Sequence, residues 1–228
     1  MIFKLLVALP SLQQVDADFA LGWVPVVMAM TRHKVPGYEN QIMDFSNKRS
    51  SLLPKSRHEL VKDALAGDYT HILFVDSDQT FPSSIVHRLA RYGKNIIGCN
   101  VATKRQGGSY PTARAKPKND SEWFAGHMVY SNGKKGLERV WRLGFGVMLI
   151  NLEVFRKIEK PWFMIEYVEK VDDYIGEDWF FCRKAEEAGF DIWVDHDLSR
   201  EIGHVGPWIY SHQDVEPEPT QDQLRSVA

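Results

Sequence analysis

Two aspartates separated by one residue, Asp76 and Asp78, directly follow an apolar run at residues 72–75. A short continuous apolar run that ends in a turn signal predicts a buried strand of a parallel sheet. Ligands of open α/β sheets bind at the carboxyl ends of such strands. Two carboxylates at that place suit Mg²⁺ or Mn²⁺ and contacts with phosphate. The simpler alternative is that Asp76 only ends the strand and Asp78 caps a helix that begins near Pro82.

A second acidic pair, Glu177 and Asp178, opens a predicted helix that Gly189 closes. Acidic residues in a first turn often only complement the helix dipole. Adjacent helical residues point roughly 100° apart, so one of the two can face a cleft while the other makes structural contacts. Further on, His204 lies between two glycines, in a predicted loop after the last strand. It is either an ordinary surface or core histidine or a further ligand of a metal site.

The elements that must position these residues alternate along the first part of the chain. Strands are expected at residues 2–9, 41–45, 72–75 and 96–101. Helices are expected at 16–30, with a kink or an early stop at Pro25, at 56–66 after a capping box, and from Pro82 to Gly93. In the helix at 16–30, the expected apolar stripe is Phe19, Leu21, Val24 and Val27. This alternation predicts a doubly wound α/β sheet with helices on both faces. A dinucleotide-binding Rossmann site and a Walker A site are both disfavoured, because neither glycine motif is present.

The amino-acid composition changes after residue 101. Residues 102–139 predict an irregular loop region rich in Gly, Pro and basic residues, which meets an anionic ligand or is simply solvated. A strand is expected at 141–150, a helix capped by Asn151 to about residue 158, and a strand at 190–194. Gly144 and Gly146 suggest a bulge or a close approach of a ligand to the backbone. Residues 211–228 are expected to form a loosely attached polar tail.

Composition excludes several classes of protein. The chain of 228 residues is 44% hydrophobic and 25% charged, which is ordinary for one globular α/β domain. Its formal net charge of -2 gives no general attraction to nucleic acid or to an anionic membrane. No apolar run is long enough to span a bilayer, and we expect no signal peptide. Cys99 and Cys182 fit reduced core thiols, so a cytoplasmic location, in a bacterium or in an infected host cell, is expected.

This ordered set of motifs resembles the GT-A-fold glycosyltransferases, in particular the small, family 2-like enzymes of bacteria, phages and large viruses. The resemblance covers about residues 2–206 and rests on Asp76-Ser77-Asp78, Gly144 and Gly146, Glu177-Asp178 and His204. It implies a GT-A-like, mainly parallel sheet sandwiched by helices in one domain at 1–210. Residues 1–101 would form the nucleotide-binding half and residues 102–210 the acceptor half.

The resemblance also implies a donor site. A Mn²⁺ or Mg²⁺ ion would grip the diphosphate of a nucleotide sugar, with Asp78 and His204 as ligands and Asp76 either on the ribose or sharing the metal. Several further positions would contact the donor: Pro10, Ser11, Asp44, Arg57 and Ser77. Lys104 or Arg105 would add positive charge beside the diphosphate. Asp178, beside Glu177 in the catalytic acidic pair, would accept the proton of the acceptor hydroxyl in an inverting transfer.

Other functions remain open at this point. Retaining enzymes of the same fold share the aspartates and the histidine. A sugar-phosphate nucleotidyltransferase would carry a basic, glycine-rich loop after the first strand, where this chain reads PSLQQVDAD. A binding module with vestigial acids would bind a nucleotide sugar without turnover. The acceptor is unresolved among glycans, lipid-linked molecules, proteins and modified nucleic-acid bases.

Overall fold

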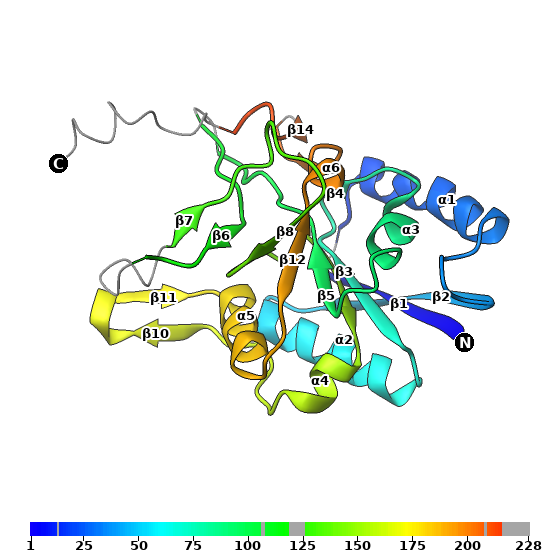
Figure 1. Ribbon diagram of the computed structural model, residues 1–228, viewed down its shortest axis with the longest axis horizontal. Coiled ribbons are helices and arrows are strands. Elements are labelled where there is room, and N and C mark those ends of the chain that lie inside the picture. The colour runs from blue at the N-terminus through cyan, green and yellow to red at the C-terminus, as the bar shows by residue number, and fades with distance from the viewer. Residues whose placement is uncertain (13, 106–107, 119–125, 208, 216–228) are drawn as a thin grey trace.

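The centre of the molecule is a seven-stranded sheet in the order β2-β1-β3-β9-β5-β12-β8 (Figure 1). The computed structural model describes residues 1–12, 14–105, 108–118, 126–207 and 209–215. The strands of this sheet are β1 (Ile2–Ser11), β2 (Asn40–Arg49), β3 (His71–Val75), β5 (Ile96–Gly98), β8 (Leu137–Val140), β9 (Val147–Asn151) and β12 (Ile192–Asp195). Strand β9 is antiparallel to β3 and β5, and β8 is antiparallel to β12, whereas the other pairs are parallel. Five strands therefore share one direction, which confirms a mixed, mainly parallel sheet.

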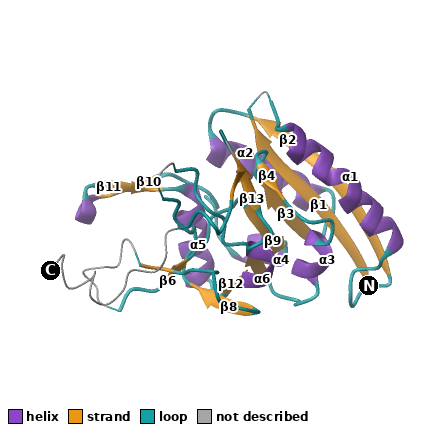
Figure 2. Ribbon diagram, turned by 90° about the horizontal axis from the view of Figure 1, so that it is seen from above, coloured by secondary structure: helices purple, strands orange, loops and turns teal. Residues whose placement is uncertain are grey.

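Helices cover both faces of this sheet, as Figure 2 shows from above. They are α1 (Ala17–Arg32), α2 (Leu53–Ala66), α3 (Ile85–Ala90), α4 (Glu153–Lys157), α5 (Glu177–Glu187) and α6 (His196–Ser199). Alternate residues of β3 enter two separate cores: Ile72 and Phe74 pack with α2, α4 and α5, whereas Leu73 and Val75 pack with α1, α3 and α6. This alternation follows from the two-residue period of a strand. It explains why β3 is buried throughout.

Among the described residues, three small sheets lie outside the central one. Strand β13 (Gly203–Val205) pairs with β4 (Gln79–Thr80) and with β14 (Ile209–Tyr210). Strand β6 (Arg114–Ala115) pairs with β7 (His127–Met128), and β10 (Glu166–Val168) forms a hairpin with β11 (Asp173–Ile175) through a 3₁₀ turn at Glu169–Val171. Both views place the β10–β11 hairpin at one side of the molecule, next to the start of α5 (Figures 1 and 2).

Two predicted boundaries near the first strands are wrong. Strand β2 continues to Arg49, because its polar second half pairs with β1 along the whole length of that strand. Asp44 therefore lies in the middle of β2. Helix α2 begins at Leu53 with Pro54 in its first turn, so the predicted capping box lies inside the helix, and Ser56 is buried there. Pro54 suits that position, because its missing N–H would have no helical partner.

The buried face of α1 differs from the predicted stripe. Phe19, Trp23, Val26 and Met30 face the core. Their spacing keeps one helical face, whereas the predicted stripe mixed two faces. Leu21, Val24 and Val27 are exposed. The helix also continues through Pro25, which lines an open surface groove.

Two predictions for the second half also need correction. The predicted strand at 141–150 is strand only from Val147, where β9 begins, because the chain leaves β8 at Val140 and enters β9 three positions away in the sheet. The predicted tail does not begin at residue 211. His212 is 3% exposed and its Nε2 bonds the carbonyl of Asn100, while Val215 bridges to Ser109. Residues 216–228 of that predicted tail lie outside the described residues.

Both predicted halves contribute strands to the same central sheet. Among the residues that the structure describes, no helix is long and apolar enough to cross a membrane.

Candidate functional site

A cavity of about 310 Å³ opens at the carboxyl ends of β1 and β3. It is lined by Pro10, Ser11, Leu12, Ser50, Ser51, Leu53, Asp76, Ser77, Asp78 and His204. The parallel pairing of β1 with β2 and β3 brings these strand ends to one edge of the sheet. Six residues singled out from the sequence thus line one cavity: Pro10, Ser11, Asp76, Ser77, Asp78 and His204.

Asp78 and His204, 126 positions apart in the sequence, meet because short strands join directly beside them. Strand β4 starts one residue after Asp78 and pairs with β13, which contains His204. The Val205 N–H donates to the carbonyl of Asp78 over 2.7 Å, and this bond fixes the register. Nε2 of His204 lies 3.4 Å from Oδ1 of Asp78. The predicted loop at His204 is therefore a strand, and backbone pairing sets its position.

The ring orientation of His204 is fixed from its other side. Its Nδ1 lies 2.8 Å from the carbonyl of Ala102. A carbonyl oxygen can only accept, so Nδ1 carries a proton; Nε2 donates to Asp78 when the ring is protonated and presents its lone pair there when the ring is neutral. The neutral form is the one in which this histidine and the carboxylate can share a cation.

Lys104 supplies a positive charge on the other oxygen of Asp78. Its Nζ lies 2.5 Å from Oδ2 of that carboxylate. Burial would raise the pKa of Asp78, but the hydrogen bonds from His204 and Lys104 outweigh it and lower the pKa to about 2. Asp78 therefore stays ionised at any pH at which the protein would be assayed.

Asp76 has a different role from Asp78, because a buried arginine holds it. Arg57, on α2 and 2% exposed, bonds Oδ1 of Asp76 at 3.0 Å and also bonds Oε1 of Glu177 at the start of α5. Its guanidinium lies 4.8 Å from the centre of the Phe145 ring. Burial raises the pKa of Asp76, and the charge of Arg57 offsets only part of that effect. Arg57 is thus placed between the two acidic pairs, and its expected contact with a nucleotide stays a prediction.

Asp178 lies in the same acidic group at the first turn of α5. Its Oδ1 accepts a hydrogen bond of 2.7 Å from the backbone N–H of Trp179. Burial raises its pKa first, the charge of Glu177 raises it further and Arg57 lowers it, and the pKa settles at about 6. A carboxylate with such a pKa is ionised at neutral pH and still basic enough to take a proton efficiently.

Two predicted donor residues are not brought to this cavity. Asp44 accepts a hydrogen bond from the hydroxyl of Tyr69, which precedes β3 and thus lies toward the opposite edge of the sheet. The guanidinium of Arg105 lies over the ring of Tyr110, 4.9 Å from its centre. Within the described ranges, no group of three or more His, Cys, Asp or Glu side chains is arranged to hold a metal ion. A metal sphere that includes Asp76 with Asp78 and His204 therefore stays a prediction without support from the geometry.

Four lining residues were missed from the sequence: Leu12, Ser50, Ser51 and Leu53. They follow the ends of β1 and β2. The signal was the hydroxyl-rich segment Ser50-Ser51 just before Pro54, but it is informative only if β2 is known to reach Arg49. A strand held by backbone pairing at the sheet edge leaves little hydrophobic pattern to find.

Comparisons with known proteins give a similarity of fold. A scan against models of protein families found no match, and a search of curated proteins found none. Among solved structures, the chain is similar to the crystal structure of A197 from STIV, with a TM-score of 0.55 and 15% sequence identity. The match covers 96% of this chain and 98% of that chain. The likeness therefore extends over nearly the whole architecture, and at this identity it shows the fold alone.

Proposed function

We propose that the protein is a metal-dependent glycosyltransferase of the GT-A type, which moves a sugar from a nucleotide-diphosphate sugar to a hydroxyl acceptor with inversion. The observation that carries the proposal is the meeting of Asp78 and His204 in a cavity at the carboxyl ends of β1 and β3. Asp178 lies in the acidic group that Arg57 joins to that cavity through Asp76 and Glu177. Asp78 and His204 would serve the donor, and Asp178 would serve the acceptor.

The donor half fits a divalent cation. Oδ1 of Asp78 and Nε2 of His204 face each other, and Lys104 occupies only Oδ2. Mg²⁺ is usually bound through one or two carboxylates together with substrate phosphates and waters, so two protein ligands suffice. When bound, Mn²⁺ or Mg²⁺ would act as a Lewis acid that stabilises the nucleoside diphosphate leaving group. Lys104 would add a second positive charge at the same place.

The acceptor half rests on Asp178. With a pKa of about 6, this carboxylate is mainly ionised at pH 7. It can therefore accept the proton of a hydroxyl as that oxygen attacks the sugar. The bridge from Arg57 to Glu177 holds the first turn of α5 against the end of β3, and this fixes the carboxylate relative to the donor cavity.

The first test is donor binding, measured by thermal shift with UDP-, GDP-, CMP- and dTDP-sugars, each with Mn²⁺, Mg²⁺ or EDTA. We expect one nucleotide sugar to stabilise the protein only in the presence of metal, by about 2.7 kcal/mol at a hundred times its Kd. Asp78→Asn should abolish this stabilisation, because it removes the charge that faces His204. Asp63→Asn is the matched control, since that carboxylate pairs with Lys48 and does not line the cavity.

Other results would contradict the proposal in different ways. Stabilisation by a nucleoside triphosphate with Mg²⁺, but by no nucleotide sugar, would favour a nucleotidyltransferase. Tight donor binding without transfer to any hydroxyl, including water, would favour a binding module. If no nucleotide binds with or without metal, the glycosyltransferase proposal is wrong.

A further inference from the structure

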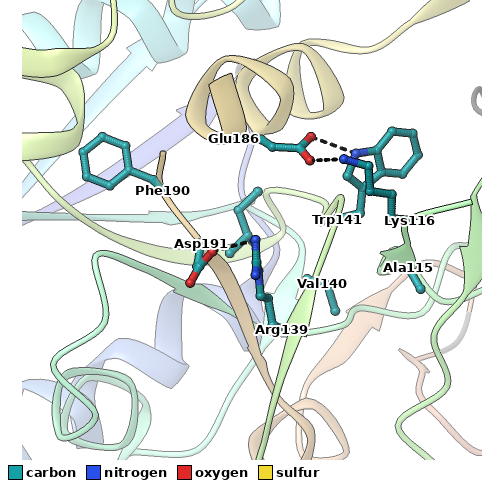
Figure 3. Close-up of a pocket in the computed structure, with 9 residues that line it drawn as sticks. Ala115, Lys116, Arg139, Val140, Trp141, Glu186, Phe190 and Asp191 are labelled. Atoms are coloured by element: carbon teal, nitrogen blue, oxygen red, sulfur yellow. Dashed lines mark hydrogen bonds and ion pairs between the residues drawn. The ribbon is translucent and has the colours of Figure 1, made fainter. Parts of the chain in front are cut away.

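A second cavity, of about 320 Å³, lies between the sheet edge and the C-terminal half of α5. Figure 3 shows its side chains, which come from the end of β6, from β8 and the residue after it, from α5, and from the segment that leads into β12. The residues that matter for its chemistry are Lys116, Arg139, Trp141, Glu186, Phe190 and Asp191. None of them belongs to the proposed catalytic centre.

Two elements connect this cavity to Asp178. On α5, Trp179 and Glu186 are seven residues apart and share a helical face, about 10 Å apart along the axis. Opposite them, the guanidinium of Arg114 lies 5.9 Å from the centre of the Trp179 ring, and its charge reaches Asp178. Lys116, two residues further, pairs with Glu186 over 2.8 Å. The segment from Arg114 to Lys116 therefore lies along the face of α5 that extends from Trp179, next to Asp178, to Glu186 in the cavity.

The cations around the cavity are each held by a carboxylate. Lys116 and the buried Arg142 both pair with Glu186, over 2.8 Å and 3.2 Å, and Arg139 pairs with Asp191 over 2.8 Å. The indole Nε1 of Trp141 also donates to Glu186 over 2.9 Å. These ions retain unused donor and acceptor positions, because an ammonium, a guanidinium and a carboxylate each bind more than one partner. The lining thus offers many hydrogen bonds, and each of its cations already has a carboxylate partner.

The cavity also presents two aromatic side chains, Trp141 and Phe190, among these polar groups. An aromatic surface surrounded by paired donors and acceptors suits a ligand with apolar faces and many hydroxyls. A neutral sugar ring has this chemistry. A nucleotide or a phosphorylated ligand would need an unpaired positive charge, which the paired lysine and arginine do not supply.

We infer that this cavity binds the non-reacting part of the acceptor, and that the acceptor is a neutral oligosaccharide. The inference rests on the proposed function, because it takes Asp178 as the base that the reacting hydroxyl approaches. It assigns Trp141, Glu186 and the Arg139–Asp191 pair as determinants of acceptor specificity. The acceptor would extend along α5 from Trp179 to these residues.

The test is binding of the labelled full chain, without donor or metal, to an array of short neutral oligosaccharides beside sialylated, sulfated and phosphorylated ones. We expect binding to a related group of neutral glycans. In titrations with the best of these, the Arg139→Ala/Asp191→Ala double variant should bind at least about tenfold more weakly, as should Glu186→Gln, because each change removes polar partners of the sugar hydroxyls. Arg139 and Asp191 are 65% and 45% exposed, so their removal leaves the core intact.

The matched control is Glu153→Ala/Arg156→Ala, which removes an exposed ion pair of the same charge on α4. It should bind the glycan like the unaltered protein. The inference is wrong if no neutral glycan binds, if sulfated or phosphorylated glycans bind best, or if the cavity variants bind as well as the control.

Donor binding in the same samples separates this inference from the proposed function. Asp78→Asn should keep glycan binding and lose metal-dependent donor binding. The cavity variants should keep donor binding and lose glycan binding. Glycan binding by a protein that binds no nucleotide sugar would contradict the inference of an acceptor subsite as well as the glycosyltransferase proposal. Donor binding and transfer with no recognition of a neutral glycan would overturn only the inference about this cavity.

Discussion

Replacing Asp178 by Asn should lower the rate of the proposed sugar transfer by about 10²- to 10⁴-fold, which is the usual contribution of a positioned general base. The amide keeps the shape of the side chain and its bond to the N–H of Trp179, but it cannot accept the proton of the acceptor hydroxyl. Donor binding, measured by calorimetry, should stay within about twofold of the unaltered protein, because Asp78 and His204 are untouched. Asp173→Asn, on the neighbouring strand β11 and exposed, is the control and should retain full activity.

The pH dependence gives a second check on the same residue. The pKa of Asp178 in the folded protein is about 6, above its ordinary value of 3.8. As a base it must be deprotonated, so kcat/KM should rise with pH through about 6 and level above pH 7.

The contribution of Asp178 to the free energy of unfolding should fall as pH rises, whereas kcat/KM rises. A raised carboxyl pKa means that the folded state holds the proton more tightly than the unfolded state, so this group destabilises the fold as pH rises from about 4 through 6. Asp178→Asn should therefore be at least as stable as the unaltered protein at pH 7 in urea denaturation, and equally stable at pH 4. A variant that loses activity because it unfolds, or that keeps full transfer, would refute the assigned role.

The parts of the site that lie within one local segment were predictable from the sequence. The run at residues 72–75 is apolar because both faces of β3 are covered, and the aspartates follow where the chain leaves the sheet. Helix α5 was predicted from Glu177, because its buried residues Phe180, Phe181 and Ala185 keep helical spacing and Gly189 adopts a positive φ after its end. In each case the sequence pattern that predicts the element lies within the element itself or directly beside it.

The parts that depend on distant contacts were not predictable. The bridge from Arg57 to Glu177 joins residues 120 positions apart, and no local pattern distinguishes this arginine from a solvated one on α2. Strand β9 enters between β3 and β5 in the antiparallel direction, so neighbours in the sequence are not neighbours in the sheet. His204 was predicted in a loop, because β13 has only three residues and its partner β4 has two. Such strands exist through pairing, not through hydrophobic pattern.

Arg57→Met has the largest expected effect on stability, and it also tests whether Arg57 sets the chemistry of the acidic group. The methionine keeps most of the volume but leaves Asp76 and Glu177 without their shared cation. Removing one partner of a buried pair costs about 3 kcal/mol or more. We expect this loss in the free energy of unfolding at pH 7, measured by urea denaturation, and a much smaller loss near pH 5. The pKa of Asp76 is already raised by burial, and without Arg57 it rises further, so protonation relieves the unpaired charge at low pH.

A purely structural arginine would change stability and nothing else, whereas this one should also move the pH profile. The charge of Arg57 lowers the pKa of Asp178, so its removal should shift the midpoint of kcat/KM upward from about 6. Arg156→Met, on α4 and 42% exposed, controls for the loss of an arginine at the surface. In a double-mutant cycle, Glu177→Gln should cost much less in the Arg57→Met background than in the unaltered protein, because the two side chains share one interaction. Independent, additive effects together with an unchanged pH midpoint would show that Arg57 does not couple the end of β3 to the start of α5.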